Sequence, residues 1–166
     1  MSNREENLAV APVVRWAKLN DAEQIAKLIN SAFRLAEEFF FEGDRIALGE
    51  VRDLMFKGRF LLAENEGKVA ACVYLEPRGD RAYLGLLSVD PERQQFGLGS
   101  WLMKVGEDHC RVLGCRFMDI NVVNLRQELF GFYERRGYVE NGLAPFPGDL
   151  DTKLPCYMVK MSKQLD

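Results

Sequence analysis

The chain has 166 residues, the length of one domain with a single hydrophobic core. Its formal net charge of −3 argues against a nucleic acid or an anionic membrane as a partner, and no apolar run approaches the ~20 residues that a membrane-spanning helix needs. Four scattered cysteines and one histidine argue against a metal site or a disulfide framework, so we expect no metal and reduced thiols in the cytoplasm.

The spacing of apolar residues predicts elements in the order β-α-α-β-β-β-α-β-α-β-β. Residues 1–11 show no periodicity and predict a flexible tail, so a single domain covers 12–166. This order predicts an α/β fold with a mixed, mostly antiparallel sheet flanked by helices. The expected strands are 13–17, 59–63, 68–76, 81–89, 117–123, 138–140 and 156–161, and the expected helices hold the apolar residues of 25–33, 48–55, 98–112 and 126–136.

Local signals predict where the helices begin and end. Asn20 precedes the first helix and Glu23 follows three residues later, which is the pattern of a capping box. Gly58 and Gly137 are the expected C-terminal caps of the second and the last helix. The strand at 117–123 is apolar at most positions, so we expect it to be buried and parallel to the strand at 81–89.

A glycine-containing loop joins the strand at 81–89 to the helix that follows it. Asp90-Pro91 ends the strand because proline has no N–H to donate. Gly97 and Gly99 then let the backbone turn sharply and let a ligand approach closely. The first N–H groups of a helix lack helical partners and attract anions, so this loop suits a phosphate or pyrophosphate. The alternative is a plain strand–helix turn.

Two motifs resemble those of the GNAT superfamily of N-acetyltransferases. The stretch 89–99, Val-Asp-Pro followed by Gln-x-x-Gly-x-Gly, is similar to that family's Gln/Arg-x-x-Gly-x-Gly/Ala signature. The stretch 124–138, with Tyr-Glu-Arg-Arg-Gly-Tyr at its end, is similar to the later Tyr-x-x-x-Gly-aromatic motif. The resemblance implies the acyl-CoA N-acyltransferase fold, in which two parallel strands splay apart around the cofactor. It also implies transfer of an acetyl group from acetyl-CoA directly to an amine in a ternary complex.

The resemblance further implies which residues hold acetyl-CoA. Backbone N–H groups of 95–100 would bind the pyrophosphate, and the backbone of 87–89 would pair with the pantetheine amides. The expected contacts are therefore Leu87, Ser88, Val89, Gln94, Gln95, Phe96, Gly97, Leu98, Gly99 and Ser100. Phe96 stands where the family often has a basic residue.

One further cofactor contact does not match the family's spacing. The family commonly has Asn seven residues before its Tyr, but here Arg126 has that spacing and Asn124 lies nine residues before Tyr133. Either the loop is two residues longer, or Asn121 or Asn124 makes the contact. We therefore include Asn124 and Arg126 among the expected cofactor contacts.

Tyr133 occupies the position that acts as general acid in many family members. A phenol with its ordinary pKa of ~10 is protonated at neutral pH, and a thiolate whose thiol has a pKa of ~8.5 would take its proton favourably only in the transition state. The alternative is an aromatic residue that only packs on the inner face of its helix. Many relatives have a base five residues before the Asp-Pro, where Gly85 stands here. Glu76 and Glu128 remain as candidates, or water deprotonates an α-amine with a pKa of ~8.

The segment Phe39-Phe40-Phe41 lies between acidic residues and is the least usual part of the chain. Aromatic rings commonly line clefts, so Phe39, Phe41 and Glu42 are expected to contact a small-molecule or peptide amine. The neighbouring acids would attract a cationic amine, or they form a solvated face, and the rings then cover the edge of the core. Relatives in the family often dimerise, so a homodimer is an alternative to a monomer.

Two other functions compete with an acetyltransferase. One is a catalytically silent acyl-CoA-binding sensor or interaction module, which the absent strand carboxylate favours. The other is a structural domain that binds no CoA. Tyr133 in the position of the acid favours the enzyme.

Overall fold

The computed structural model describes residues 12–147 and 151–166, so the tail expected at 1–11 lies outside the described residues. Its helices and strands follow one another in the order that the sequence predicts. They are β1 (Val13–Trp16), α1 (Ala22–Glu37), α2 (Leu48–Lys57), β2 (Arg59–Asn65), β3 (Lys68–Arg78), β4 (Arg81–Val89), α3 (Leu98–Val112), β5 (Phe117–Val123), α4 (Gln127–Glu134), β6 (Val139–Pro145) and β7 (Tyr157–Gln164), with short 3-10 helices at Leu19–Asp21 and Pro91–Phe96.

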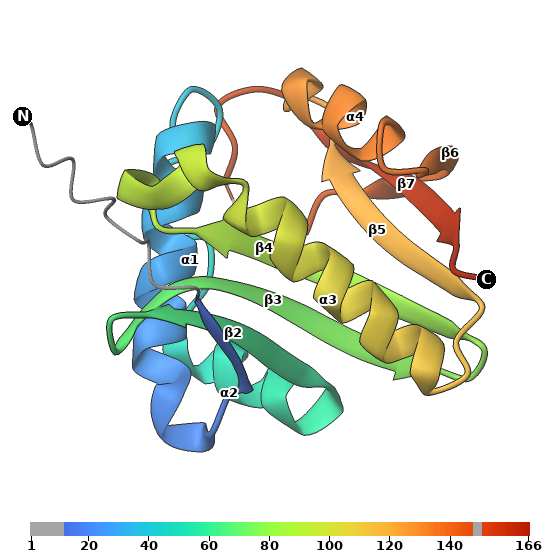
Figure 1. Cartoon of the computed structure of the whole chain (residues 1–166). Coiled ribbons are helices and arrows are strands. Elements are labelled where there is room, and N and C mark those ends of the chain that lie inside the picture. Colours follow the sequence, from blue (N-terminus) through green and yellow to red (C-terminus); the bar gives the residue numbers. More distant parts are fainter. Residues whose placement is uncertain (1–11, 148–150) are drawn as a thin grey trace, which may run out of the picture.

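The seven strands of the described residues form one sheet in the order β1-β2-β3-β4-β5-β7-β6. Every neighbouring pair is antiparallel except β4 and β5, which run parallel. This confirms the predicted mixed, mostly antiparallel sheet. Figure 1 shows α3 crossing one face of the sheet, with α1 and α2 on the other.

Both faces of the central strands are buried because helices cover each of them. Along β2, Leu61 packs into the core under α3 and its neighbour Leu62 into the core under α1 and α2. Cys72 and Val73 of β3 divide between the two cores in the same way. Side chains alternate between the faces of a strand, so a strand with two covered faces is apolar at almost every position.

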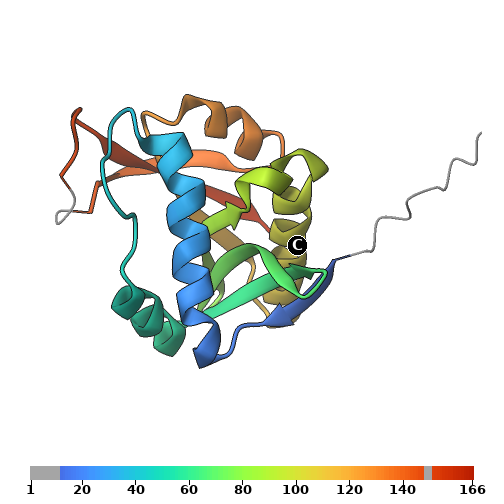
Figure 2. The same cartoon turned by 90° about the vertical axis from the view of Figure 1, so that its left-hand side faces the viewer.

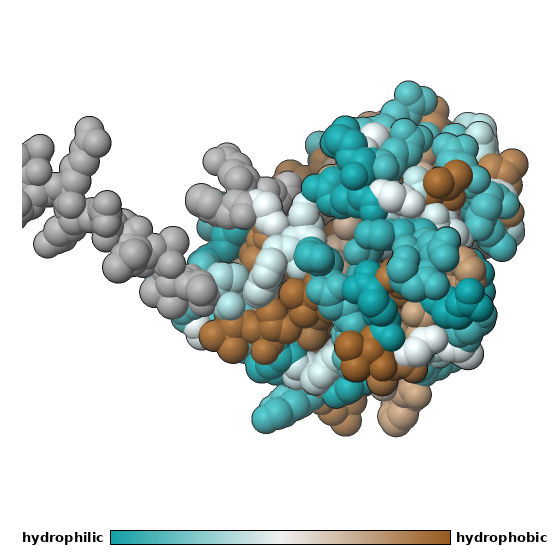
Figure 3. Space-filling model, turned by 45° about the vertical axis from the view of Figure 1, so that its right-hand side comes forward, coloured by the Kyte–Doolittle hydropathy of each residue, from teal (hydrophilic) through white to brown (hydrophobic). Residues whose placement is uncertain are grey.

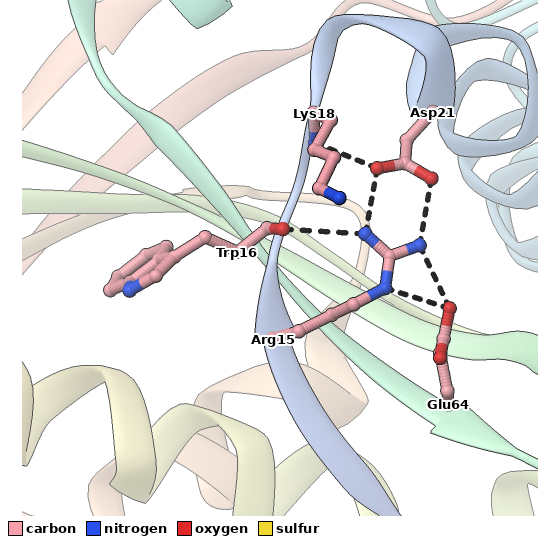
Figure 4. Close-up of polar contacts among 5 residues, drawn as sticks. All are labelled: Arg15, Trp16, Lys18, Asp21 and Glu64. Atoms are coloured by element: carbon pink, nitrogen blue, oxygen red, sulfur yellow. Dashed lines mark hydrogen bonds and ion pairs between the residues drawn. The ribbon is translucent and has the colours of Figure 1, made fainter.

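The start of α1 differs from the prediction, which was wrong about Asn20 as the cap. Asn20 is exposed within the first 3-10 helix, and the buried residue at the start of α1 is Asp21. The Asp21 carboxylate accepts hydrogen bonds from the Lys18 N–H at 2.7 Å and from both terminal nitrogens of Arg15 at 2.8 Å (Figure 4). Arg15 also donates to Glu64 of β2 at 2.8 Å. Arg15 of β1 therefore fixes the position of Asp21, and local sequence preference does not reveal this contact.

Gly58 ends α2 as predicted, but for a different physical reason. Its backbone is extended, with φ of −152°, and not left-handed. A Cβ atom on Gly58 would lie 2.4 Å from the Leu75 carbonyl oxygen and 2.7 Å from the Tyr74 hydroxyl oxygen. Glycine is needed here because the end of α2 lies directly against β3.

The strand predicted at 138–140 is longer than expected. β6 runs from Val139 to Pro145 and pairs only with β7, at the edge of the sheet. Its residues are almost all exposed, so it lacks the alternation of apolar and polar residues that marks a half-buried strand. Pro145 is tolerated because an edge strand does not need every N–H for the ladder.

The helices of the described part of the chain are too short or too polar to span a membrane. On the face drawn in Figure 3, hydrophilic residues cover most of the surface and apolar residues gather in small groups. This is the mixed surface that globular proteins ordinarily present.

Candidate active site

β4 and β5 are paired at their first residues only, and this opens the sheet. The pairs are Arg81–Phe117, Ala82–Met118 and Tyr83–Asp119. Beyond Tyr83 the two strands diverge toward their C-terminal ends (Figure 1). The paired end is held by Arg81, which donates two hydrogen bonds to Asp119 at 2.6 and 2.8 Å.

A β-bulge in β4 lies where the strands separate. Cys72 of β3 pairs with Ser88, but Tyr74 pairs with Gly85, so two residues of β4 lie opposite one of β3. A bulge of this kind bends its strand. Leu86 has a φ of 53°, a left-handed conformation that costs a non-glycine residue about 1–2 kcal/mol. Its carbonyl accepts a hydrogen bond from the Ser88 hydroxyl at 2.9 Å.

A cavity of about 420 Å³ occupies the opening between the two strands. Figure 2 shows the surrounding elements: the end of β4 lies between α1 and the start of α3, with α4 above them. The residues that line the cavity are Ala32, Phe33, Ala36, Glu37, Arg45, Tyr83, Leu84, Gly85, Leu86, Leu87, Ser88, Val89, Gly97, Gly99, Ser100, Ile120, Asn121, Val122, Val123, Arg126, Leu129, Phe132, Tyr133 and Met158.

The structure brings most of the expected cofactor residues together in the wall of this cavity. Those that line it are Leu87, Ser88, Val89, Gly97, Gly99, Ser100 and Arg126. Leu98 is instead buried in the core under α3, and Asn124 accepts a hydrogen bond from the Tyr157 N–H and does not line the cavity. Asn121 does line it. The side chains of Gln94, Gln95 and Phe96 lie outside the described part of the structure.

The two glycines of the loop have different roles. Gly97 has a φ of 65°, which a residue with a side chain adopts only with strain, and it is the cap from which α3 begins. A Cβ atom on Gly99 would lie 3.2 Å from Val89 Cγ2. Gly99 therefore lets the start of α3 approach the end of β4, and the first N–H groups of α3 stand at the edge of the cavity.

Arg136 is a residue near this loop that the sequence analysis missed. Its guanidinium donates hydrogen bonds to Ser100 Oγ and, at 2.7 Å, to the Phe132 carbonyl oxygen. It also lies 3.7 Å from the centre of the Phe132 ring. Arg136 thus fixes a positive charge beside the start of α3, where Phe96 replaces the basic residue that relatives often have. Arg136 lies in the turn directly after α4, and its position three residues after Tyr133 was the available signal.

Tyr133 lines the cavity, and its hydroxyl makes no hydrogen bond to any described residue. The ring is buried and packs edge-on against Phe132 and Tyr138, with centroid distances of 5.1 and 5.7 Å. Burial raises the pKa of Tyr133 to about 12, although Arg126 and Arg136 act to lower it. The phenol is therefore protonated at physiological pH and has its proton available for a ligand.

Tyr83 occupies the space that the absent side chain of residue 85 would need. A Cβ atom on Gly85 would lie 2.7 Å from the Tyr83 hydroxyl oxygen. The two residues are two apart on one strand and so share a face. Burial raises the pKa of Tyr83, which lines the cavity in protonated form. A tyrosine two residues before a strand glycine was the signal that sequence reasoning overlooked.

The two expected bases lie away from the cavity lining. Glu76 accepts a hydrogen bond from the Tyr74 hydroxyl at 2.7 Å and pairs with Arg78. Burial raises the pKa of Glu76, but these two hydrogen bonds more than offset it and hold the pKa below its usual value. Glu128 is exposed and pairs with Arg126 at 2.6 Å. Both carboxylates thus have protein partners and neither reaches the cavity wall.

The expected acceptor residues also lie outside the cavity lining. Phe39 is 53% exposed, and Glu42 is exposed with Lys153 at 3.9 Å. Phe41 is buried in a small separate cluster with Phe40 and Val123. The segments around them supply the wall instead, through Phe33 and Glu37 of α1 and Arg45 of the connection to α2.

Comparison with known proteins identifies relatives of this arrangement. The model of the acetyltransferase (GNAT) family matches residues 23–138. The structure is similar to that of PaiA N-acetyltransferase from Thermoplasma acidophilum in complex with coenzyme A, with a TM-score of 0.76 and 15% identity over 93% of this chain and 99% of that one. No curated protein matches the sequence.

Two further solved structures have the same fold. The ribosomal-protein-S18-alanine N-acetyltransferase from Escherichia coli has a TM-score of 0.74 and 16% identity, over 93% of this chain and 94% of that one. Ard1 from Thermoplasma volcanium has a TM-score of 0.75 and 19% identity, over 93% of this chain and 98% of that one.

Proposed function

The chain belongs to the GNAT family of N-acetyltransferases, and we propose that it transfers an acetyl group from acetyl-CoA directly to an amine in a ternary complex. The observation that carries this proposal is the cavity between β4 and β5. It joins the glycine loop at the start of α3 to Tyr133, whose hydroxyl has no hydrogen-bond partner among the described residues. Because the four cysteines are unpaired, we place the enzyme in a reducing compartment, the cytoplasm.

The residues around the opening fit the two ends of coenzyme A. Beyond Tyr83, no strand pair is formed between β4 and β5 in the described residues. An extended pantetheine arm would lie along Leu87 and Ser88 there, as an added strand does. The pyrophosphate would meet the first N–H groups of α3, which Gly97 and Gly99 leave accessible, with Arg136 close by. When bound, acetyl-CoA supplies the activated thioester.

The side chains of the cavity supply the acid but no dedicated base. Tyr133 holds a proton that it can give to the departing thiolate, because a phenol with a pKa of about 12 has lost almost none of its protons at neutral pH. Among the described residues of the lining, Glu37 is the only carboxylate, and it faces two arginines. The acceptor amine therefore loses its proton to water before it reacts, which suits an amine with a pKa of ~8.

Thermal melting with and without acetyl-CoA tests the cofactor site directly. A ligand that binds only the folded protein at a hundredfold excess over Kd stabilises it by about 2.7 kcal/mol, a measurable shift. The shift is expected in the wild type and absent in Gly97→Glu. Gly114→Glu is the matched control, because Gly114 also has a positive φ with open space around it but lies at the far end of α3. It should melt lower than the wild type and keep the full shift.

The outcomes separate the three functions. If acetyl-CoA does not shift the melting temperature of the wild type, the protein is a structural domain. A shift without turnover of any amine in a broad screen indicates an acyl-CoA sensor. A shift together with release of CoA that depends on an added amine supports the acetyltransferase.

A further inference from the structure

Arg45 is a buried guanidinium in the cavity wall with no hydrogen bond to any described residue. Its side chain is 12% exposed, and it lies over the rings of Phe33 and Phe146, 5.6 and 5.0 Å from their centres. Its Nε atom is fully buried without a partner. An arginine presents five N–H donors in a planar fork, and leaving buried donors unpaired is unfavourable. A ligand with suitably placed acceptor atoms would satisfy them.

Glu37 is the carboxylate that faces Arg45, but it accepts no hydrogen bond from the Nε–H of Arg45. The Glu37 side chain is 2% exposed, and its Oε1 lies 3.7 Å from Arg45 Nε, too far for a hydrogen bond. This oxygen also has no hydrogen-bond partner among the described residues. Burial raises the pKa of Glu37, while Arg45 and Arg126 oppose the rise. The pair is loosely held, as expected of groups that are positioned for a third partner.

The cavity has two arginines and one carboxylate in its lining. Its charged lining residues are Glu37, Arg45 and Arg126. Arg126 lies 3.4 Å from Glu37 Oε2 and 2.6 Å from Glu128, which is outside the cavity. Arg126 is thus neutralised by two carboxylates, one of which it shares with Arg45. With Glu128 counted, the two arginines and the two carboxylates balance, and Arg45 is the arginine whose Nε has no hydrogen-bond partner among the described residues.

This charged group lies at the reacting end of the cavity, away from the glycine loop. Arg45 is near enough to Tyr83 to lower the pKa of that phenol, and Arg126 has the same effect on Tyr133. Arg45 and Glu37 belong to the connection between α1 and α2 and to the end of α1, whereas the pyrophosphate end is formed by the start of α3. The incompletely paired Arg45 therefore faces the acceptor.

We propose that the acceptor is a small amine that also carries a carboxylate, and that Arg45 binds this carboxylate. The inference rests on the proposed acetyltransferase function. Phe33 and Phe146 hold the guanidinium plane by cation–π contacts, and Glu37 positions it from the other side. The planar fork then meets both oxygens of the carboxylate, a geometry for which arginine is better suited than lysine.

Ligand binding tests the proposal without requiring turnover. The probes are the standard L-amino acids and their amides, added to the CoA-bound protein in melting experiments. At least one amino acid should raise the melting temperature while its amide, which lacks the negative charge, does not. Equal shifts within every pair, or a larger shift with the amide, would overturn the proposal.

Variants assign the effect to Arg45. In Arg45→Gln, the Kd of the selected amino acid should rise at least tenfold, while the shift with CoA alone stays unchanged. Arg45→Lys should recover part of the binding because it keeps the charge but not the fork. Arg34→Gln is the matched control, since Arg34 is an exposed arginine of α1 that pairs with Asp44 outside the cavity. It should bind as the wild type does. Unchanged amino-acid binding in Arg45→Gln contradicts the assignment.

The same assays separate a failure of this proposal from a failure of the proposed function. If CoA binds and the amides are acetylated as well as the amino acids, the protein is an acetyltransferase and Arg45 does not select a carboxylate. If amino acids bind through Arg45 but are never acetylated, the carboxylate site stands and the enzymatic function fails. If CoA with amino acids gives no shift beyond that of CoA, the carboxylate proposal fails.

Discussion

Buried charged side chains are paired differently in two regions of the molecule. Near β1, the guanidinium of Arg15 meets two carboxylates, Asp21 and Glu64, with hydrogen bonds of 2.8 Å to each. In the opening between β4 and β5, Arg45 and Glu37 are more deeply buried, yet Arg45 Nε and Glu37 Oε1 have no hydrogen-bond partner among the described residues. Buried polar groups in stable structures are normally satisfied. The first network therefore serves the fold, and the second is completed by a ligand.

This contrast has a general consequence for substitutions. Changes at the β1 end should alter the free energy of unfolding and leave catalysis intact in the protein that remains folded. Changes in the opening should alter binding or turnover with little effect on unfolding. Four substitutions test this separation.

Replacing the proposed acid gives the largest expected effect. Tyr133→Phe should lower kcat by about 10²- to 10⁴-fold, the usual contribution of a general acid, with the KM for acetyl-CoA within about twofold of the wild type. The ring and its packing are kept, so the melting temperature should change little. Steady-state kinetics of CoA release measure the effect, with Tyr157→Phe, an exposed tyrosine outside the cavity, as the control. A loss of less than about fivefold would make Tyr133 a packing residue.

The close approach of α2 to β3 gives the largest expected effect on stability. Gly58→Ala should lower the free energy of unfolding by about 1–3 kcal/mol, because the new Cβ would meet a backbone oxygen and must displace it. Urea unfolding measures this change. Gly49→Ala is a suitable control, because Gly49 lies in α2 with open space around it and alanine favours a helix. A neutral Gly58→Ala would show that the contact relaxes without loss.

More of the residues predicted to hold the cofactor line the cavity than of those predicted to contact the acceptor. Gly97, Gly99 and the strand-ending Asp90-Pro91 act through local backbone geometry, so their pattern is legible in a short window. On the acceptor side, Glu37 ends α1 and Arg45 lies in the connection to α2. Their importance lies in burial and incomplete pairing, which only the folded chain creates. Phe39 was predicted to contact the acceptor from local composition alone, and it is exposed.

Asn20 shows the same limit within the fold. Asn20 and Asp21 are both good helix caps, and the local pattern favours the first. Arg15 holds the Asp21 carboxylate by two hydrogen bonds, and Arg15 is a residue of β1 whose position depends on the sheet. The predicted order of the elements is correct despite this error, because the order depends on apolar periodicity over many residues. The start of a helix can depend on a single contact.

Removing the Asp21 carboxylate near β1 should have a moderate effect on the free energy of unfolding, and this effect should depend on pH. The hydrogen bonds from Arg15 hold the pKa of Asp21 below its ordinary 3.8, against the opposing effect of burial. Between the folded and unfolded pKa values the unfolded chain binds more protons, so this stabilisation is present above about pH 4 and is lost as the pH falls through the folded pKa. Asp21→Asn should lower the free energy of unfolding by about 2 kcal/mol at pH 7.

Urea unfolding at several pH values measures the gap between Asp21→Asn and the wild type. The gap should narrow as the pH falls below about 4, and kcat of the folded variant should be unchanged. Asp44→Asn is the control, because Asp44 forms an exposed ion pair with Arg34, a class of contact that contributes little. A gap that is the same at all pH values would mean that the Asp21 charge does not stabilise the fold.

The smallest expected effect tests the pyrophosphate end of the opening. Arg136 is held by Ser100 and Phe132 beside the start of α3, so its charge would act on the phosphates of the cofactor at short range. Arg136→Gln should raise the Kd for acetyl-CoA about fivefold, equivalent to ~1 kcal/mol, and should weaken the dependence of Kd on salt. Arg135→Gln, at the exposed neighbouring position, should change neither. Equal effects of both variants would assign the change to net charge, and the start of α3 would then hold the pyrophosphate by its backbone alone.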